Sequence, residues 1–269
     1  MAFAALRLCA LGYATDTKRQ GLHLGLSKAI KETGPMSALF IGPLLITHIN
    51  VHTAFQVFGT VTLLALPLTW LLPDDAQTER PKMRGRVARP TWFDGLIFAT
   101  ALADGVVIVT IGLLLLYAGI SEATILALSA FFLAVKRLSV TIVGPLSGWL
   151  ADKWNIRNLF LLSVAGFFVG LVLISAGVTV AGITTLFIST AINQTLAAGV
   201  ALNLSTNTKL NILSALTTWR DLGTAVGALI GGYLLVLSEP SVVYGLLALI
   251  ILAFALKVAR LQPSEPDFS

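Results

Sequence analysis

The sequence predicts an all-α, polytopic membrane protein, and three observations lead to that prediction. Of the 269 residues, 56% are apolar and only 12% are charged, whereas a soluble domain carries roughly 25% charge. Long apolar runs recur along the chain, and each approaches the roughly 20 residues that a helix needs to cross a bilayer. The basic residues gather in alternate connections between these runs, a pattern typical of membrane proteins whose basic loops stay in the cytoplasm.

Eight apolar runs follow a short N-terminal stub at residues 1–13, which is too short to cross a bilayer. We expect every run to be a helix, because hydrocarbon forces backbone polar groups to pair within one segment. Strands of a barrel would instead give shorter runs of alternating polarity. The predicted spans are 21–49, 54–72, 93–117, 123–149, 159–177, 181–202, 211–237 and 242–260.

The connections alternate in charge along the chain. Those at 50–53, 118–122, 178–180 and 238–241 contain no Lys or Arg. The others carry the bases, with five of them between residues 80 and 89. The charge pattern therefore places the loop at 73–92 and the C-terminus in the cytoplasm, beside the plasma or inner membrane. Because the bases lie in these connections, they indicate membrane topology and no nucleic-acid partner.

An internal repeat is visible between segments 189 residues apart. Residues 31–34, Lys-Glu-Thr-Gly, align with residues 220–223, Arg-Asp-Leu-Gly, and Gly42 aligns with Gly231. Membrane transporters are commonly built from such repeats. The repeat predicts a six-helix half at 93–261 and a remnant of an N-terminal half at 1–72. The loop at 73–92 joins them, residues 262–269 form a tail, and the missing helices would precede Met1.

The run from Gly148 to Arg157 joins two long apolar spans and reads Gly-Trp-Leu-Ala-Asp-Lys-Trp-Asn-Ile-Arg. It resembles the signature of the major facilitator superfamily, approximately Gly-x-Leu-Ala-Asp-Arg/Lys-x-Gly-Arg/Lys-Arg/Lys. Two positions depart from the signature, since Asn155 replaces a Gly and Ile156 replaces a base. Because Asn tolerates the left-handed backbone that Gly supplies, we expect Asn155 to preserve the turn.

Two further stretches carry the resemblance toward the N-terminus. Residues 13–16, Tyr-Ala-Thr-Asp, are similar to the end of the family's fourth helix, and the segment from Gly34 to Gly42 and Pro43 is similar to its fifth. The resemblance thus covers helices five to twelve of twelve. Ala29 and Ala38 stand where the fifth-helix motif of many proton-coupled exporters has Gly.

The resemblance implies a secondary active transporter that moves a small solute by alternating access, with proton-coupled efflux slightly preferred over uptake. The alternative is a truncated, non-transporting or regulatory remnant of such a transporter. The implied partners are the lipid bilayer, a small-molecule substrate and possibly the missing N-terminal half. The motifs of hydrolases, zinc enzymes and ATP-driven pumps are absent from the sequence, so we predict no enzyme activity, no catalytic residues, no cofactor and no metal.

The candidate gating residues lie in the signature: Gly148, Asp152, Lys153 and Arg157. The resemblance implies that Asp152 faces the start of the span 21–49 and holds one conformation closed. A carboxylate is stabilised at a helix N-terminus, by about 0.3–1 kcal/mol at exposed sites. The alternative is a solvated acid that caps the next helix.

Charged and amide side chains within the predicted spans form the second group of candidates. Asp104 falls near the bilayer centre, where an acid should face the bundle interior. Lys136 and Arg137 point in directions 100° apart, so one is expected in the cavity and the other against a neighbouring helix, with Asp104 as an available counter-ion. Asp104 is a candidate for proton or cation coupling or for substrate contact, with a neutral acid hydrogen-bonded between helices as the alternative. For Lys136 and Arg137 the alternative is a structural ion pair that locks two helices. Asn193 and Gln194 are amides suited to orienting a polar substrate, with interhelical bonding as the alternative.

A third group, at the aligned positions of the repeat, comprises Lys31, Glu32, Arg220 and Asp221. These residues suggest a charge network between the two halves, with snorkelling to the interface as the alternative. Gly223, Gly227 and Gly231 share one helix face and predict close packing.

Overall fold

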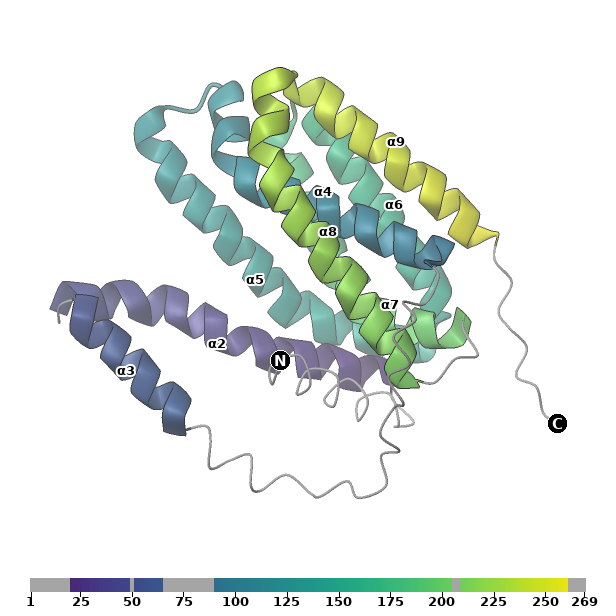
Figure 1. Cartoon of the computed structure of the whole chain (residues 1–269), viewed down its shortest axis with the longest axis horizontal. Coiled ribbons are helices and arrows are strands. Elements are labelled where there is room, and N and C mark those ends of the chain that lie inside the picture. Colours follow the sequence, from purple (N-terminus) through teal and green to yellow (C-terminus); the bar gives the residue numbers. More distant parts are fainter. Residues whose placement is uncertain (1–19, 49–50, 65–89, 205–208, 261–269) are drawn as a thin grey trace. The chain divides into compact units, whose positions relative to one another are not determined.

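The computed structural model describes residues 20–48, 51–64, 90–204 and 209–260, and every regular element in these ranges is an α-helix (Figure 1). The prediction of an all-α polytopic membrane protein is confirmed. The helices are α2 (Gln20–His48), α3 (Val51–Leu64), α4 (Trp92–Tyr117), α5 (Glu122–Lys153), α6 (Ile156–Ser175), α7 (Thr179–Leu204), α8 (Lys209–Leu237) and α9 (Pro240–Ala259).

Six of the described helices, α4 to α9, are long and apolar enough to cross a membrane. They correspond to the six predicted spans from residue 93 onward. Helix α2 has the expected length, but Lys28, Lys31 and Glu32 lower the hydropathy of its first half. Only 14 residues of α3 are described. Membrane crossing by α2 and α3 therefore stays a prediction.

The chain divides into two compact units, residues 1–32 with 88–269, and residues 33–87. The division falls inside α2, so that Glu32 is the last residue of α2 in the first unit. The predicted domain boundaries at 72, 92 and 261 stay predictions, since residues 65–89 and 261–269 lie outside the described ranges. The candidate site residues all lie in the first unit.

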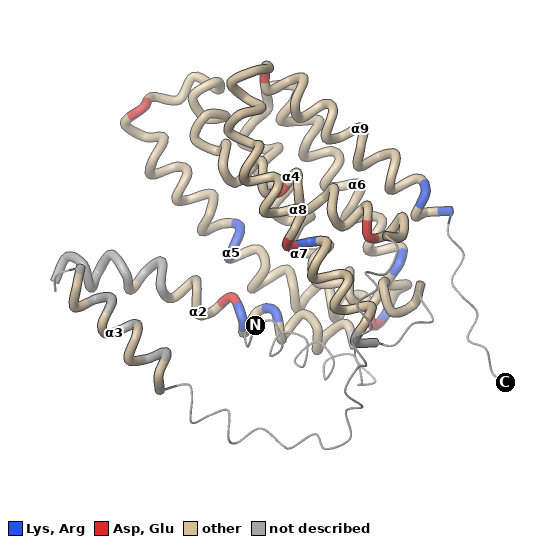
Figure 2. The backbone as a smooth tube through the Cα atoms, viewed as in Figure 1, with Lys and Arg blue, Asp and Glu red and all other residues tan. Residues whose placement is uncertain are grey.

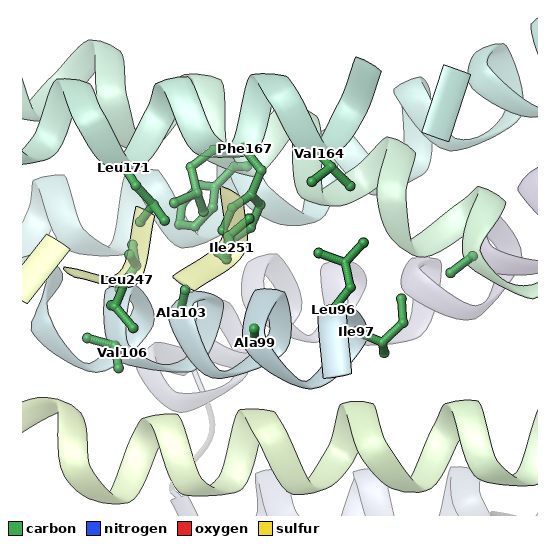
Figure 3. Packing of buried hydrophobic residues seen from close by; sticks show 14 of the residues in the cluster. Leu96, Ile97, Ala99, Ala103, Val106, Val164, Phe167, Leu171, Leu247 and Ile251 are labelled. Atoms are coloured by element: carbon green, nitrogen blue, oxygen red, sulfur yellow. The ribbon is translucent and has the colours of Figure 1, made fainter. Parts of the chain in front are cut away.

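Helix α4 packs against α8, α9, α5 and α7, and thus provides the centre of the six-helix bundle. Small residues on α4 let neighbouring helices approach closely. Figure 3 shows Phe167 and Leu171 of α6 and Leu247 and Ile251 of α9 beside Ala99 and Ala103 of α4. These side chains are buried almost completely, so α4 is held on this side by a continuous apolar core.

On its other side α4 meets the glycine face of α8. A Cβ added at Gly223 would lie 2.5 Å from the carbonyl oxygen of Phe98, and one at Gly231 would lie 3.0 Å from the Cα of Val106. A Cβ at Gly227 would collide with the backbone of Leu102. The two helices therefore touch backbone to backbone over two turns, in agreement with the close packing expected of these glycines.

The signature run is mostly helical, because α5 continues to Lys153 and α6 begins at Ile156. Asn155 has φ −65° and ψ 113°, and its side-chain oxygen accepts a hydrogen bond of 3.0 Å from the amide of Arg157. The expectation of a left-handed Asn155 was wrong, because its side chain caps α6 and an N-cap residue adopts extended backbone. Among the described residues, only glycines have positive φ.

The two ends of the six-helix bundle differ in charge. The connections from α4 to α5, from α6 to α7 and from α8 to α9 contain no Lys or Arg, and Figure 2 shows acids without bases at that end of the bundle. Lys153, Arg157, Lys257 and Arg260 lie at the opposite end. This asymmetry follows the predicted topology, while the side of the membrane that each end faces stays a prediction.

We predict that Gly227→Ala destabilises the bundle by about 1–3 kcal/mol, because the added methyl group collides with the Leu102 backbone. Gly232→Ala, on the same helix, is the matched control, since a Cβ there meets nothing within 4 Å. It should leave stability unchanged or raise it slightly, because Ala favours helix more than Gly does. Thermal unfolding of the purified variants measures both effects, and equal midpoints would contradict the packing described.

Candidate functional site

Asp152, in the last turn of α5, binds the start of α2. Its Oδ1 accepts a hydrogen bond of 2.8 Å from the backbone amide of Gly21, and its Oδ2 accepts one of 3.0 Å from the amide of Leu22. The first amides of a helix have no partner within that helix, and the helix dipole favours an anion at this end. Asp152 thus lies where the family resemblance implies.

Glycines bring the two helices close enough for this contact. Gly148 lies directly against Gly21, so that a Cβ on either residue would collide with the backbone of the other. One turn further on, a Cβ at Gly25 would lie 2.5 Å from the carbonyl oxygen of Gly144. Only glycine allows such an approach along both helices, which explains why Gly148 precedes Asp152 by one turn.

The two basic residues of the signature, Lys153 and Arg157, bind different partners. The Lys153 Nζ lies 3.8 Å from the centre of the Trp149 ring, which gives a cation–π contact on the same helix. The Arg157 guanidinium donates hydrogen bonds to the carbonyl oxygens of Val258, at 3.2 Å, and Ala259, at 2.9 Å. A cation at the last carbonyls of α9 is stabilised by the helix dipole, so Arg157 ties the α5–α6 connection to the end of α9.

Two further side chains join α2 to the bundle, about two and three turns along α2 from the Asp152 contact. The Lys28 ammonium donates a hydrogen bond to the backbone carbonyl of Gln194 on α7. The Glu32 carboxylate accepts one from the Arg137 guanidinium on α5, with 2.5 Å between Nη1 and Oε2. Polar contacts therefore hold residues 21–32 of α2 to the bundle at three successive levels, in addition to the buried Leu24 and the glycine packing.

Asp104 and Lys136 form a bidentate ion pair between α4 and α5. The Lys136 Nζ lies 2.7 Å from Oδ1 and 2.6 Å from Oδ2 of Asp104. The Lys136 side chain is 13% exposed and the Asp104 side chain is 6% exposed. Lys136 and its neighbour Arg137 thus point to different helices, as their angular separation requires. Here the structure brings together the two residues that the sequence paired.

A small hollow lies between α4, α7 and α8, next to the ion pair. Its polar lining comprises Thr100, Asp104, Thr190, Asn193, Gln194 and Arg220. The hollow has a volume of about 20 Å³, which is room for one or two water molecules. The Asn193 Nδ2 and the Thr190 Oγ1 are buried without a hydrogen-bond partner. Buried polar groups are normally satisfied, so these two atoms indicate a polar occupant.

The ion pairs of Glu32 and Arg220, two residues of the predicted charge network, do not join the aligned segments of the repeat. Glu32 pairs with Arg137, whereas the Arg220 Nε lies 3.9 Å from the Oδ1 of its neighbour Asp221. Arg220 also lines the hollow. Lys31, the remaining member, is exposed. The role of these four residues as a network between halves therefore stays a prediction.

Sequence reasoning missed three members of the site. Lys28 and Thr190 are not among the candidates from the sequence, and Arg220 is assigned there to the charge network alone. A signal for Thr190 exists, since it precedes Asn193 and Gln194 by three and four residues and so shares their helix face. No comparable signal exists for Lys28, whose partner is a backbone carbonyl. Among the described residues, no group of His, Cys, Asp and Glu is arranged to hold a metal.

Comparison with known proteins agrees with the resemblance noted above. A family model described as Major Facilitator Superfamily matches residues 1–207 of the 269. No curated protein matches the chain.

We predict that Lys136→Met destabilises the protein by about 3–5 kcal/mol, because it leaves the Asp104 carboxylate buried without a counter-ion. The double variant Asp104→Asn with Lys136→Met should regain most of that loss. Arg137→Met removes the adjacent charge and is the control. Its ion pair is less buried than that of Lys136, with the Arg137 side chain 45% exposed, so its loss should destabilise the protein less than Lys136→Met does. Thermal unfolding compares the variants, and a double variant as unstable as Lys136→Met would refute this account.

Proposed function

Because the chain belongs to the major facilitator superfamily, we propose that it is a secondary active transporter that moves a small solute across the membrane by alternating access. The family assignment favours transport over catalysis. Six apolar helices of membrane-spanning length supply the necessary scaffold.

The contact of Asp152 with the start of α2 carries the proposal. Alternating access requires a closure that can open, and this closure uses reversible polar bonds. A carboxylate at a helix N-terminus contributes about 0.3–1 kcal/mol when exposed, and up to about 2 kcal/mol when partly buried. The pair of Glu32 and Arg137 adds to this, and it is less buried than the pair of Asp104 and Lys136. Substrate binding can supply a free energy of this size.

In this proposal residues 21–32 of α2 form a latch against α5 and α7, and the latch lies at the cytoplasmic end of the bundle. The basic side chains at that end support the assignment of the side. Asp152, Glu32–Arg137 and Lys28 hold the latch closed. Opening would separate Gly21 and Gly25 of α2 from Gly148 and Gly144 of α5, a contact called the glycine crossing here. The cytoplasm would then have access to α7.

The Asp104–Lys136 pair is the proposed coupling element. A proton on Asp104 would remove its negative charge, and Lys136 would then lie buried without a counter-ion. Because an unpaired buried charge is costly, the pair would favour a different arrangement of α4 and α5. This sequence of events couples proton movement to the conformational change, and we propose efflux of the solute in exchange for protons.

We predict that Asp152→Asn opens the latch, because the amide loses the charge that binds the α2 amides. The reporter is Thr195→Cys in a Cys9→Ser background. Thr195 is fully buried, and its Oγ1 lies 3.4 Å from the position of a Cβ on Gly144, beneath the glycine crossing. The reaction rate of this cysteine with a membrane-impermeant thiol reagent should rise about tenfold, since a loss of about 1.4 kcal/mol is a factor of ten.

The reagent should react only when it is added to the cytoplasmic face, as in inside-out vesicles. Glu122→Gln is the matched control, since it removes one exposed acid from the opposite end of α5, and it should leave the rate unchanged. Equal rates in Asp152→Asn and its parent would refute the latch. Reaction from the outer face alone would refute the assigned topology.

We predict that Asp104→Asn abolishes the pH dependence of solute flux, whereas Asp104→Glu retains it, because only the carboxylate variants can bind and release a proton. Proteoliposomes containing the full chain are given a pH gradient and a panel of small anionic, neutral and cationic solutes. Unchanged pH dependence in Asp104→Asn would refute the coupling role. Absence of flux for every solute would refute transport by this chain and favour the non-transporting alternative.

A further inference from the structure

The end of α9 presents two cations that pair with no acid of the described ranges. Lys257 and Arg260 are exposed, and Figure 2 shows basic residues at this end of the helix. The ion pairs formed within the described residues involve other side chains. Asp94, in the first turn of α4, is engaged elsewhere, since its Oδ2 accepts hydrogen bonds of 2.9 and 2.7 Å from the amide and hydroxyl of Thr91.

The end of the helix does not neutralise these two cations. The macrodipole places about half of a negative charge at the C-terminus of a helix, which is less than the two positive charges of Lys257 and Arg260. Arg157 binds at the same place, through the carbonyl oxygens of Val258 and Ala259. The end of α9 therefore keeps a net positive charge, which attracts an anion from outside the described part of the chain.

Trp92, at the start of α4, lies beside the cations, and we call Trp92, Lys257 and Arg260 the α9 corner. Trp92 is 53% exposed, and its ring centre lies 5.7 Å from the Lys257 Nζ. The same ring lies 5.9 Å from the ring of Phe254 on α9. Phe254 packs directly on Gly95, where an added Cβ would lie 2.4 Å from its ring. The start of α4 and the end of α9 are thus held together.

An exposed apolar face of α9 leads to the two cations. Leu246, Leu249 and Ile250 are 56%, 61% and 46% exposed. At 100° per residue they share one stripe of the helix surface, about 100° wide, with Lys257 and Arg260. The stripe from Leu246 to Lys257 is about 16 Å long at a rise of 1.5 Å per residue, which is roughly half of the 30 Å hydrocarbon core of a bilayer. This face is therefore apolar over the depth of one leaflet and cationic at its end.

We propose that the α9 corner binds the headgroup of an anionic phospholipid, whose acyl chains lie along the apolar face of α9. Lys257 and Arg260 bind the phosphate, and a guanidinium can bind two phosphate oxygens at once. The Trp92 ring packs beside the headgroup, as tryptophan does at membrane interfaces. Basic groups near helix ends on the cytoplasmic side bind such headgroups in membrane proteins. The lipid site is separate from transport and does not depend on the function proposed above.

Other ligands fit the α9 corner less well. A zwitterionic phospholipid would place its ammonium group near Lys257 and Arg260, and like charges at close range repel. Inorganic phosphate has the charge but no acyl chains to contact the apolar face of α9. The basic residue at the end of α5, Lys153, follows Asp152 directly in the sequence, so that these two residues carry no net charge. An anionic lipid is thus the ligand that matches both the charge and the apolar face.

The test measures binding of phosphatidylglycerol to the full chain by native mass spectrometry in a non-ionic detergent. The full chain includes Glu265 and Asp267, which lie outside the described ranges, so their effect on the site enters the measurement. Phosphatidylglycerol should bind about tenfold more tightly than phosphatidylcholine of the same chain length, because two bases attract its net charge. Equal affinities would overturn the proposal. Displacement of the lipid by millimolar inorganic phosphate would also overturn it, since a free anion would then suffice.

Lys257→Gln and Arg260→Gln should each weaken phosphatidylglycerol binding about fivefold, since a base near anionic headgroups contributes about 1 kcal/mol and 1.4 kcal/mol is a factor of ten. Lys257→Arg keeps the charge and should keep the affinity. Lys153→Gln is the matched control, because it removes one exposed base from the same end of the bundle, and it should leave the affinity unchanged. An equal loss in Lys153→Gln would indicate diffuse attraction and overturn the site, as would unchanged binding in the double variant of Lys257→Gln with Arg260→Gln.

Discussion

The structure depends on one constraint, that a charge buried among apolar helices must meet a partner. A lone charge at the bilayer centre costs several kcal/mol, so Asp104 and Lys136 have to face each other, and this pair joins α4 to α5. Because Arg137 follows Lys136 directly, it points elsewhere and meets Glu32 of α2. The two adjacent bases thus tie α5 to α4 and to α2, while α5 packs chiefly against α7.

Glycines make these polar contacts reachable, since ordinary side chains would keep the helix axes too far apart. At the crossing of α2 and α5, Gly21 and Gly148 touch through their backbones, which brings Asp152 within 2.8 Å of an α2 amide. Between α4 and α8 a glycine face has the same effect and places Arg220 at the hollow that Asp104 also lines. The close approach of the helices at these glycines therefore allows the polar side chains to reach their partners.

Much of the fold could be predicted from the sequence, because it depends on helix periodicity or on the cost of leaving polar groups unpaired in hydrocarbon. The six spans follow from hydropathy, and the divergence of Lys136 and Arg137 follows from helix geometry. The convergence of Thr190, Asn193 and Arg220 could not be predicted, because it depends on how α7 and α8 are rotated toward each other. Asn155 was misjudged because an amide side chain can cap the next helix as well as permit a left-handed turn. The partner of Lys28 was unpredictable, since every residue has a carbonyl.

The two sides of the latch differ in how far they tolerate substitution. On the α5 side it depends on one carboxylate, which most substitutions of Asp152 would remove. On the α2 side the donors are the backbone amides of residues 21 and 22, which every amino acid except proline possesses. Leu22 can therefore vary widely without loss of its amide, while Gly21 is restricted only by the space beside Gly148. Evolutionary drift should thus be broad at the start of α2 and narrow at the end of α5.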